Sequence, residues 1–274
     1  MTDGLDLNAY LARIGYSGSR APTLETLKAV VIAHTDAVTF ENLNPFLGLP
    51  VKLDLASLQA KVVHGGRGGY CFELNGLLFA ALRAMGYRVT GLGGRVIWNQ
   101  PVETVSPRTH MIIRVDMDDG VRLVDVGLGG MTLTGVLDMV PDVVQATPRE
   151  PFRLVEEGGD WAGWLRVEAK IGSEWRATCR FDQTIQRPID YEVANHYTST
   201  SPASHFTQML TAARVGPAGR RVLRNTELGL HRLDGPSERQ ALTSVAEVED
   251  ALRDVFGLSL PDRTLLRERV ARLL

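Results

Sequence analysis

The spacing of hydrophobic residues changes its period at Gly86. Before Gly86, apolar residues recur every three or four positions, which is the spacing of helices that bury one face. After Gly86, apolar and polar residues alternate, which is the spacing of half-buried β-strands. The sequence therefore predicts an α+β, multi-domain protein that is helical first and mainly β afterwards.

Several segments before the change fit helices. Thr23 is a suitable N-cap for one of them, and Gly86 lies where another should end. The predicted helices are residues 5–16, 23–38, 55–63 and 71–87, with a polar turn at 39–45. Because the connections between them are short, we expect residues 1–87 to form a helical bundle.

The middle of the chain reads as two β-hairpins with an additional strand before them. Their turns are residues 118–120 and 171–174, both of which contain glycine. The predicted strands are residues 89–98, 111–117, 121–126, 164–170 and 175–181. We therefore expect residues 88–190 to form an antiparallel β-barrel or sandwich.

The last part of the chain has a mixed pattern. We expect a strand over residues 221–233, a turn at Asp234–Gly235, and helices over 245–255 and 264–274. We place a domain boundary near Asp190, so that residues 191–274 form a third, α/β domain.

Composition narrows the class of protein. The chain has 274 residues, 44% of them hydrophobic, and a net charge of −2, so no overall field attracts nucleic acid. No apolar run approaches the length of a membrane span, and the first residues do not resemble a secretory signal. Two cysteines in so long a chain are typical of a reduced protein, so we expect a cytoplasmic location. No histidine or cysteine pair has metal-ligand spacing, so we expect no metal; a homo-oligomer remains open.

Cys71 lies at the start of the helix predicted over residues 71–87. Gly68 and Gly69 interrupt regular structure just before it, so the thiol falls in the first helical turn. Unpaired backbone N–H groups and the positive end of the helix dipole favour thiolate over thiol there. The alternative is that Cys71 is a small buried residue, as most free cysteines are. We expect Cys179 to be such an inert residue, in a strand.

A catalytic thiol needs a base, and the base needs a group that orients it. His110 begins a predicted strand, and Asp125 lies within another among apolar residues, where a carboxylate requires a partner. The structural alternative is a satisfied core histidine, and an ordinary ion pair of Asp125 with Arg114. A simple hairpin would pair Asp125 near Ile113 or Arg114, roughly 10 Å or more from His110 along the strand.

Four segments carry a resemblance to a known family. They are the nucleophile motif at residues 67–75 (RGGYCFELN), an upstream signature at 40–43 (FENL), a histidine segment at 109–110 (TH) and an aspartate segment at 124–127 (VDVG). In sequence, order and separation they resemble the arylamine N-acetyltransferases. The chain's length and layout also fit that family, and residues 201–206 resemble its segment with a pocket aromatic.

The resemblance implies a catalytic triad of Cys71, His110 and Asp125, arranged as in papain-like enzymes. It implies a helical bundle, a β-barrel and a C-terminal α/β lid. It also implies ping-pong transfer of an acetyl group from acetyl-CoA to an arylamine or arylhydrazine through acetyl-Cys71. Leu128 stands where the family commonly has phenylalanine, which bears on amine selectivity.

The resemblance also indicates residues around the triad. For the acceptor pocket we expect Phe40, Tyr70, Thr109, Leu128, Gly129 and Phe206, and for CoA the glycines Gly127, Gly129 and Gly130. Core packing is the alternative role of the aromatic residues. We expect Arg67 to be structural, with its guanidinium on Glu41 or Asn42 so that the thiol loop is held against the second helix.

Two rival functions remain at the sequence level. A papain- or transglutaminase-like thiol hydrolase or acyltransferase would use the same triad with water or a lysine side chain as acceptor. A degenerate relative would bind a ligand and carry an inert Cys71. The reactivity of Cys71 and the amine dependence of turnover distinguish these from an acetyltransferase.

Overall fold

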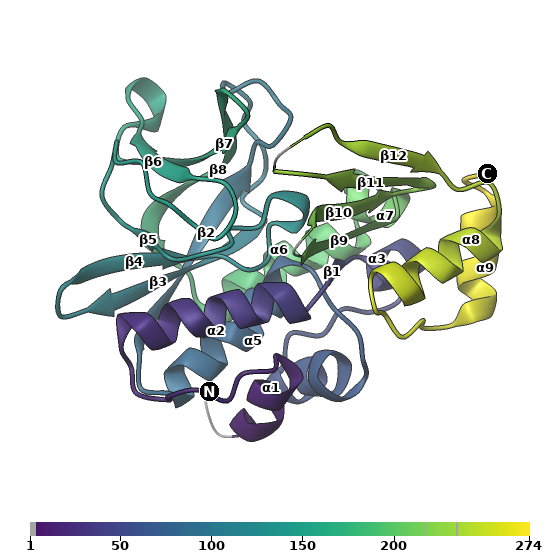
Figure 1. The fold of residues 1–274 in the computed structure, drawn as a ribbon, viewed down its shortest axis with the longest axis horizontal. Coiled ribbons are helices and arrows are strands. Elements are labelled where there is room, and N and C mark those ends of the chain that lie inside the picture. Colours follow the sequence, from purple (N-terminus) through teal and green to yellow (C-terminus); the bar gives the residue numbers. More distant parts are fainter. Residues whose placement is uncertain (1–3, 217, 234) are drawn as a thin grey trace.

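The structure is a computed structural model that describes residues 4–216, 218–233 and 235–274. Its first part is helical (Figure 1), with α1 (Leu7–Arg13), α2 (Leu24–Ala37), α3 (Leu43–Leu47), α4 (Leu55–Leu58) and α5 (Cys71–Ala84). The four expected helices are confirmed: three have shorter ends, and α4 continues as a π-helical turn over Gln59–His64, one residue beyond the expected end. The polar turn expected at 39–45 is wrong: it contains strand β1 (Phe40–Glu41) and most of α3.

The middle of the chain forms a seven-stranded antiparallel sheet of strand order β5-β4-β3-β2-β8-β7-β6. Its strands are β2 (Arg88–Val96), β3 (His110–Met117), β4 (Gly120–Val124), β5 (Leu137–Asp138), β6 (Phe152–Glu156), β7 (Leu165–Ile171) and β8 (Glu174–Ile185). After β5 the chain bridges to β6 at Gln145–Phe152, so the sheet curls into a nearly closed barrel. Both expected hairpins are confirmed, whereas β5 and β6 were not expected.

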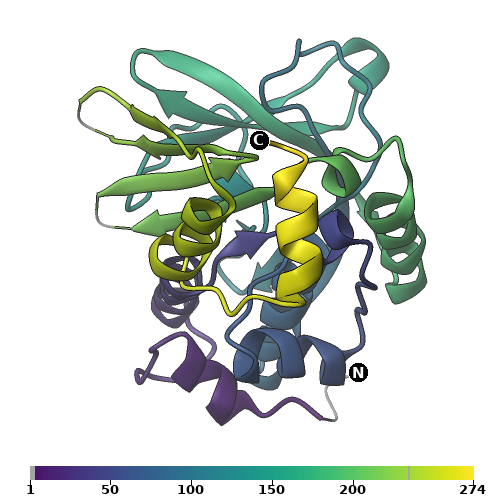
Figure 2. The same ribbon diagram turned by 90° about the vertical axis from the view of Figure 1, so that its right-hand side faces the viewer.

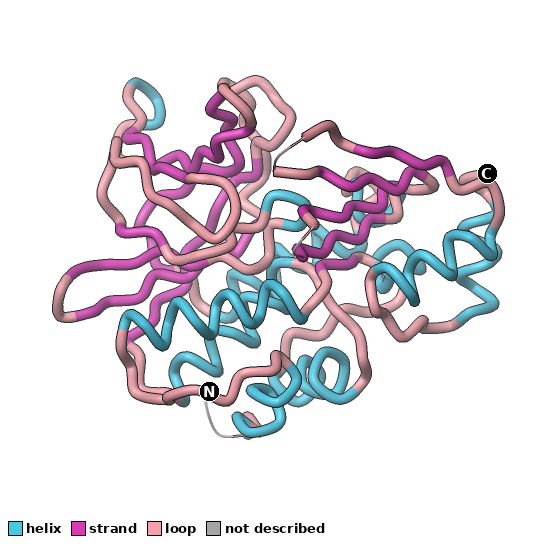
Figure 3. Tube along the Cα trace, viewed as in Figure 1, coloured by secondary structure: helices cyan, strands magenta, loops and turns pink. Residues whose placement is uncertain are grey.

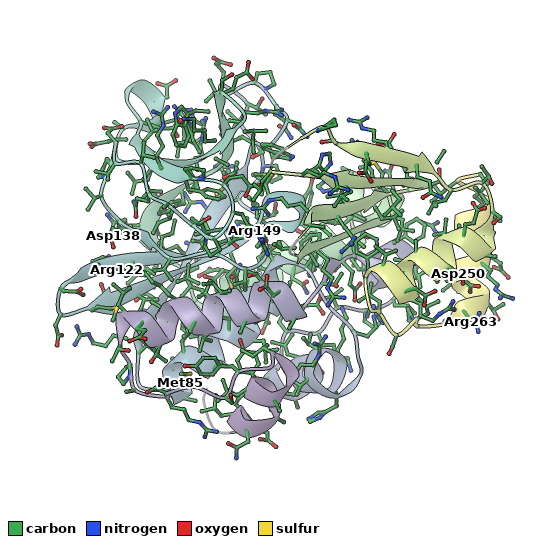
Figure 4. The ribbon with its side chains drawn as sticks, in the orientation of Figure 1. Met85, Arg122, Asp138, Arg149, Asp250 and Arg263 are labelled. Atoms are coloured by element: carbon green, nitrogen blue, oxygen red, sulfur yellow. The ribbon has the colours of Figure 1, made fainter. Side chains whose placement is uncertain are left out.

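The barrel interior is apolar because alternate residues of its strands point inward. Ile112, Leu123, Phe152 and Phe181 are all almost completely buried there. On the outside, Arg122 of β4 pairs with Asp138 of β5 at 2.8 Å, and both lie at the same edge in Figure 4. The alternation that predicts the strands is therefore the one that fills this core.

The C-terminal part joins the N-terminal part through a second antiparallel sheet of order β1-β9-β10-β11-β12. Its strands after β1 are β9 (Thr211–Gly216), β10 (Gly219–Arg224), β11 (Glu227–His231) and β12 (Glu238–Ala241). The single strand expected over 221–233 is wrong, because the chain turns at Asn225, whose φ is 54°, and forms a hairpin. The turn expected at Asp234–Gly235 includes a residue outside the described part of the chain.

Helices complete the C-terminal part. They are α6 (Pro188–Thr200), α7 (His205–Gln208), α8 (Val245–Asp250), which continues as a π-helical turn over Ala251–Val255, and α9 (Arg263–Ala271). The helices expected over 245–255 and 264–274 are confirmed, whereas α6 was not expected, and Asp190, the expected boundary, lies within it. Figure 2 shows α9 and the second sheet on one side of the molecule. In Figure 3 most helices lie below and to the right of the barrel strands.

Within the described residues, no helix has the length and apolar character required to cross a lipid bilayer. The three parts pack around three apolar clusters, one of which joins α2, α5 and β3. That cluster includes Cys71, Val124 and Ala213, so residues from all three parts share one core at the level of the thiol.

Candidate active site

Helix α5 begins at the thiol. Tyr70 has extended backbone angles as N-cap, and Cys71 is the first helical residue, which confirms the expected position in the first turn. The Glu73 carboxylate accepts a hydrogen bond from the Tyr70 backbone N–H at 3.1 Å and closes the helix start. A Cβ on Gly69 would lie 2.7 Å from the same carboxylate, which is why only glycine fits before Tyr70.

His110 and Asp125 lie against each other. Nε2 of His110 is 2.6 Å from Oδ2 of Asp125, and both side chains are almost completely buried. Oδ1 of Asp125 accepts hydrogen bonds from the Asn75 amide and the Gly127 backbone N–H, both at 2.9 Å. The separation of roughly 10 Å that a simple hairpin would impose is therefore absent. The alternative ion pair of Asp125 with Arg114 is wrong, because Arg114 binds Asp116 instead.

Asn75 explains why the hairpin does not keep the two residues apart. Strand β4 ends at Val124, opposite Ile113, so Asp125 lies outside the sheet. Beyond that point the Asn75 side chain, from α5, bridges the two chain segments. Its amide N–H donates to the Met111 carbonyl at 2.8 Å, and its amide oxygen accepts from the Val126 N–H at 2.9 Å. The chain after β4 thereby diverges from β3, and the Asp125 carboxylate turns to the imidazole.

The electrostatics of the pair follow from burial and charge. Burial would lower the pKa of His110, but the charge of Asp125, its hydrogen bond and the neighbouring Cys71 raise that pKa to about 10. Burial would raise the pKa of Asp125, but the charge and hydrogen bond of His110, with the Asn75 and Gly127 bonds, lower it below its ordinary value. The imidazole therefore holds a proton at neutral pH and the carboxylate does not.

Cys71 lies on the other side of the imidazole. Its Sγ is 3.5 Å from the Thr109 carbonyl, directly before His110 in the chain. Because Nε2 of His110 binds Asp125, Nδ1 is the ring nitrogen left for the sulfur, whose hydrogen bond helps to raise the pKa of His110. Gly127 packs on the same residue: a Cβ there would lie 2.6 Å from Cys71 Cα. The three expected triad residues are therefore brought together.

The three expected pocket aromatics, Phe40, Tyr70 and Phe206, pack against one another. The ring centroid of Phe206 lies 6.2 Å from that of Phe40 and 5.6 Å from that of Tyr70. Tyr191, on α6, was not expected here; its ring centroid lies 5.9 Å from that of Phe72, and its hydroxyl donates to the Leu92 carbonyl at 3.1 Å. No sequence pattern indicated it, because the inner face of α6 mixes apolar residues with buried polar ones.

The expected anchor of the thiol loop is present in part. Nε and Nη2 of Arg67 donate to one oxygen of Glu41 at 3.0 and 2.8 Å, and Nη2 also donates to the Asn44 side chain. Asn42 does not contact Arg67; it binds the carbonyls of residues 206 and 209 and the N–H of Thr211, so it holds the C-terminal part. Glu41 is fully buried. Burial would raise its pKa, but the positive charges of Lys61 and Arg67 lower it below its ordinary value.

The expected glycine segment lies between the barrel and the second sheet. A Cβ on Gly129, whose φ is 75°, would contact the Phe40 ring at 3.3 Å, and Leu128 donates its N–H to Thr132. Arg220, on β10, binds the carbonyls of Gly130 and Thr132 and makes a two-point ion pair with buried Glu150 at 2.8 and 2.6 Å. Arg220 was not expected, since its sequence context is an ordinary strand.

Comparison with known proteins agrees with this geometry. A family model described as N-acetyltransferase matches residues 23–265. The arylamine N-acetyltransferase of Mycolicibacterium smegmatis is 42% identical over 262 residues, which cover 94% of each chain. The structure of Mycobacterium marinum arylamine N-acetyltransferase superposes with a TM-score of 0.93 at 40% identity, covering 98% of this chain and 99% of that one.

A second structure of the Mycobacterium marinum enzyme, in complex with CoA, superposes with a TM-score of 0.92 at 39% identity and covers 98% of this chain and 99% of that one. Sequence and fold therefore match over nearly the full length, and the family-model match over residues 23–265 contains the site residues described above. The chain belongs to the arylamine N-acetyltransferase family of acetyl-CoA-dependent acyltransferases.

Proposed function

We propose that this protein transfers an acetyl group from acetyl-CoA to arylamines or arylhydrazines by a ping-pong mechanism through acetyl-Cys71. The observation that carries the proposal is the contiguous arrangement of thiol, imidazole and carboxylate, in which Asp125 and Cys71 both stabilise a protonated His110. A thiolate beside an imidazolium is the activated form of a cysteine nucleophile.

In the first half-reaction the Cys71 thiolate attacks the thioester carbon of acetyl-CoA. The Cys71 backbone N–H, free at the start of α5, would donate to the oxyanion of the tetrahedral adduct. The adduct collapses with release of CoA, whose sulfur takes the proton from His110, and acetyl-Cys71 remains. Exchange of one thioester for another is nearly balanced in free energy, so positioning and oxyanion stabilisation account for the rate.

In the second half-reaction the amine attacks acetyl-Cys71 while His110 accepts its proton, and the thiolate leaves. Aromatic amines are uncharged at neutral pH, so they are nucleophilic without prior deprotonation. The rings of Phe40, Tyr70 and Phe206 would form the wall of the acceptor pocket, with Thr109, Leu128 and Gly129 beside it. We assign Gly127, Gly129 and Gly130 to CoA binding, because their segment lies against Cys71 and Phe40. We assign residues 191–274 to a lid over the site.

Intact-mass spectrometry tests this proposal. Treatment with acetyl-CoA should add one acetyl group to the protein and none to a Cys71→Ala variant, and a subsequent arylamine should remove it in a single turnover. Cys179 serves as the internal control, since burial raises the pKa of its thiol and the residue lies in the barrel core. Loss of the acetyl group at the same rate without amine would instead identify a thiol hydrolase.

A further inference from the structure

The segment that leads into His110 has no secondary structure of its own. Residues 97–109 join β2 to β3, and all of them lie in the described part of the chain without forming a helix or strand. The segment ends in Thr109, whose carbonyl is 3.5 Å from Sγ of Cys71. Beyond Ile97 its backbone–backbone hydrogen bonds are local turns. Side chains must therefore fix the point at which His110 begins β3.

Arginines on the outer face of the barrel hold the middle of this segment. Arg180, on β8, donates to the Val102 carbonyl, and Arg95, on β2, donates to the Ser106 carbonyl. These bonds come no closer to the triad along the chain than Ser106. The last residues before His110 therefore need a further anchor.

Arg108 provides that anchor. Its Nη2 donates to the Asp182 carboxylate on β8 at 2.8 Å, and its guanidinium lies 4.7 Å from the Trp164 ring centroid, within the range of a cation–π contact. Its stem lies on β2: a Cβ on Gly93 would be 2.9 Å from Cδ and 3.2 Å from Cγ of Arg108. A glycine in the strand lets the arginine approach this closely. Arg108 is thus held at three points, two residues before His110.

Such an anchor acts on position more than on overall stability. The side chains of Arg108 and Asp182 are 26% and 20% exposed, and ion pairs in contact with solvent contribute little to the free energy of unfolding. By contrast, a displacement of about 1 Å at a reacting group lowers a rate by about 10²-fold. A shift of the chain after Arg108 would move the Thr109 carbonyl and the His110 imidazole relative to the Cys71 sulfur.

We propose that Arg108 is a positioning residue for acetyl transfer, which fixes Thr109 and His110 against Cys71 through its contacts with β2 and β8. The inference rests on the proposed function, since acetylation of Cys71 is the reaction that this position supports. Arg108 acts on the chain that carries the imidazole, whereas Asp125 acts on the ring itself.

Single-turnover acetylation of Cys71 measures the effect. In Arg108→Ala the maximal rate should fall by about 10²-fold. The acetyl-CoA concentration that gives half of the maximal rate and the temperature of thermal unfolding should stay nearly unchanged. Arg108→Lys should recover most of the rate, because lysine keeps an aliphatic stem over Gly93 and a positive charge toward Asp182. A lysine variant as slow as the alanine variant would contradict the proposal.

Arg114→Ala is the matched control. Arg114 lies on β3, forms an ion pair with Asp116 at 2.7 Å and has a side chain that is 29% exposed, so it resembles Arg108 in pairing and exposure but follows the histidine. Its removal should leave the acetylation rate unchanged. Equal rates for Arg108→Ala and wild type, or equal losses for Arg108→Ala and Arg114→Ala, would overturn the proposal.

A small acetyl donor separates positioning from CoA binding. Because 4-nitrophenyl acetate carries no nucleotide, loss of a positioning residue should slow its reaction with Cys71 by the same factor as the reaction of acetyl-CoA. A loss confined to acetyl-CoA would instead mean that the Arg108 guanidinium binds the phosphates of CoA. That result would also overturn the proposal.

Gly93→Ala tests the contact without removing the arginine. The nearest neighbours of the added Cβ are flexible side chains, at 2.9 Å from Arg108 and 3.2 Å from Gln186, so the fold should tolerate it while the arginine is displaced. The rate of Cys71 acetylation should fall in the wild-type background and no further in Arg108→Ala, because two changes that act through one contact do not add. Equal losses in both backgrounds would contradict the proposed contact.

Alkylation distinguishes failure of this inference from failure of the proposed function. Iodoacetamide reacts with the Cys71 thiolate without an acyl donor. If the wild-type protein is not acetylated by acetyl-CoA, the proposed function fails, and the alkylation rates still decide the role of Arg108. Slower alkylation in Arg108→Ala than in wild type supports the positioning role, and equal rates overturn it.

Discussion

At the scale of single residues, the Asp125 carboxylate determines the chemistry of the site. One oxygen binds His110, and the other accepts from Asn75 and Gly127. These bonds fix the position of the carboxylate and leave it charged in a buried place, so the imidazole that faces it is charged as well. The carboxylate therefore orients the base and keeps it protonated.

Asp125→Asn should lower kcat by about 10⁴-fold, the size of the effect when the orienting carboxylate of a triad is replaced by its amide. With the charge removed, burial lowers the pKa of His110, so the thiolate loses its cationic neighbour at neutral pH. Alkylation of Cys71 by iodoacetamide should slow in parallel. An amide variant with unchanged alkylation and turnover would contradict the assigned role.

The same pair predicts how stability depends on pH. The pKa of His110 is raised, so its contribution is complete below about 6.5, the ordinary value, and is lost as pH rises through about 10. The pKa of Asp125 is lowered, so its contribution is complete above about 3.9 and is lost at lower pH. The difference in unfolding free energy between wild type and Asp125→Asn should therefore be largest between about pH 4 and 6.5 in denaturant titrations, and should decline toward pH 10. If the difference in unfolding free energy stayed constant across this pH range, it would contradict the pKa shifts of His110 and Asp125.

Gly127→Ala should destabilise the fold by about 1–3 kcal/mol, the usual effect of overpacking, and should also lower activity. The added Cβ would lie 2.6 Å from Cys71 Cα and 2.9 Å from the Asn75 amide, and the first of these is backbone that cannot move aside. Gly158→Ala is the control, because nothing lies within 4 Å of a Cβ there. Thermal unfolding with matched assays checks both, and equal behaviour of the two variants would count against the close approach.

At the scale of elements, the segment before α5 is held in place by ion pairs to two buried carboxylates. Arg67 and Lys61 both contact the buried Glu41 carboxylate, and Lys61 also binds Glu73 at 2.7 Å. Lys61 reaches both acids from the π-helical turn that follows α4, and Glu73 caps the helix that begins with the thiol. The start of α5 is thus supported by four charged side chains in alternating order.

Arg67→Ala should lower the free energy of unfolding by about 3–5 kcal/mol, because the buried Glu41 carboxylate loses both bonds to the guanidinium and keeps Lys61 at 3.6 Å and the Leu43 N–H at 2.7 Å. Soluble yield should fall more than turnover per folded molecule, measured by active-site titration of Cys71. Arg88→Ala, which removes an exposed pair with Asp118, should leave yield unchanged. Normal stability with lost turnover would argue for a catalytic Arg67.

Elements with a regular inward apolar face were predictable from the sequence, and the others were not. Helix α5 and the hairpin β3–β4 follow from their periods, and so does the position of Cys71. Helix α6 escaped prediction because its inner face mixes apolar and polar residues, and β5 and β6 because they are short or irregularly flanked. The contact of His110 with Asp125 depends on Asn75, some fifty residues away, and no local pattern reports such a bridge. Family resemblance supplied what spacing could not.

At the scale of the whole molecule, Arg220 joins the second sheet to the barrel. Its guanidinium bonds Glu150 twice and reaches the carbonyls of Gly130 and Thr132, all within one buried site. A planar fork with five donors can satisfy these acceptors together, whereas an ammonium cannot. The glycine segment beside Cys71 is thereby tied to a strand that begins almost ninety residues later.

Arg220→Lys should lower the free energy of unfolding by about 1–3 kcal/mol, since it keeps the charge but leaves buried acceptors unpaired. Arg232→Lys is the control: it alters an exposed pair with Glu238 and should have almost no effect. Equilibrium unfolding in urea measures both. Equal stability of the two variants would show that Arg220 does not tie the glycine segment to the sheet.

Strand β1 links distant parts of the chain, because Phe40 pairs with Ala213 on β9 and also bridges Gly69 just before the thiol. During synthesis on the ribosome, the residues flanking Cys71 are made long before the strand that completes their sheet. A growing chain that ends before β9 therefore has its nucleophile but not the strand that pairs with β1 beside it. Acetyl transfer should begin only after the final third of the polypeptide has been released and folded, which protects the cell from a reactive, half-built thiol.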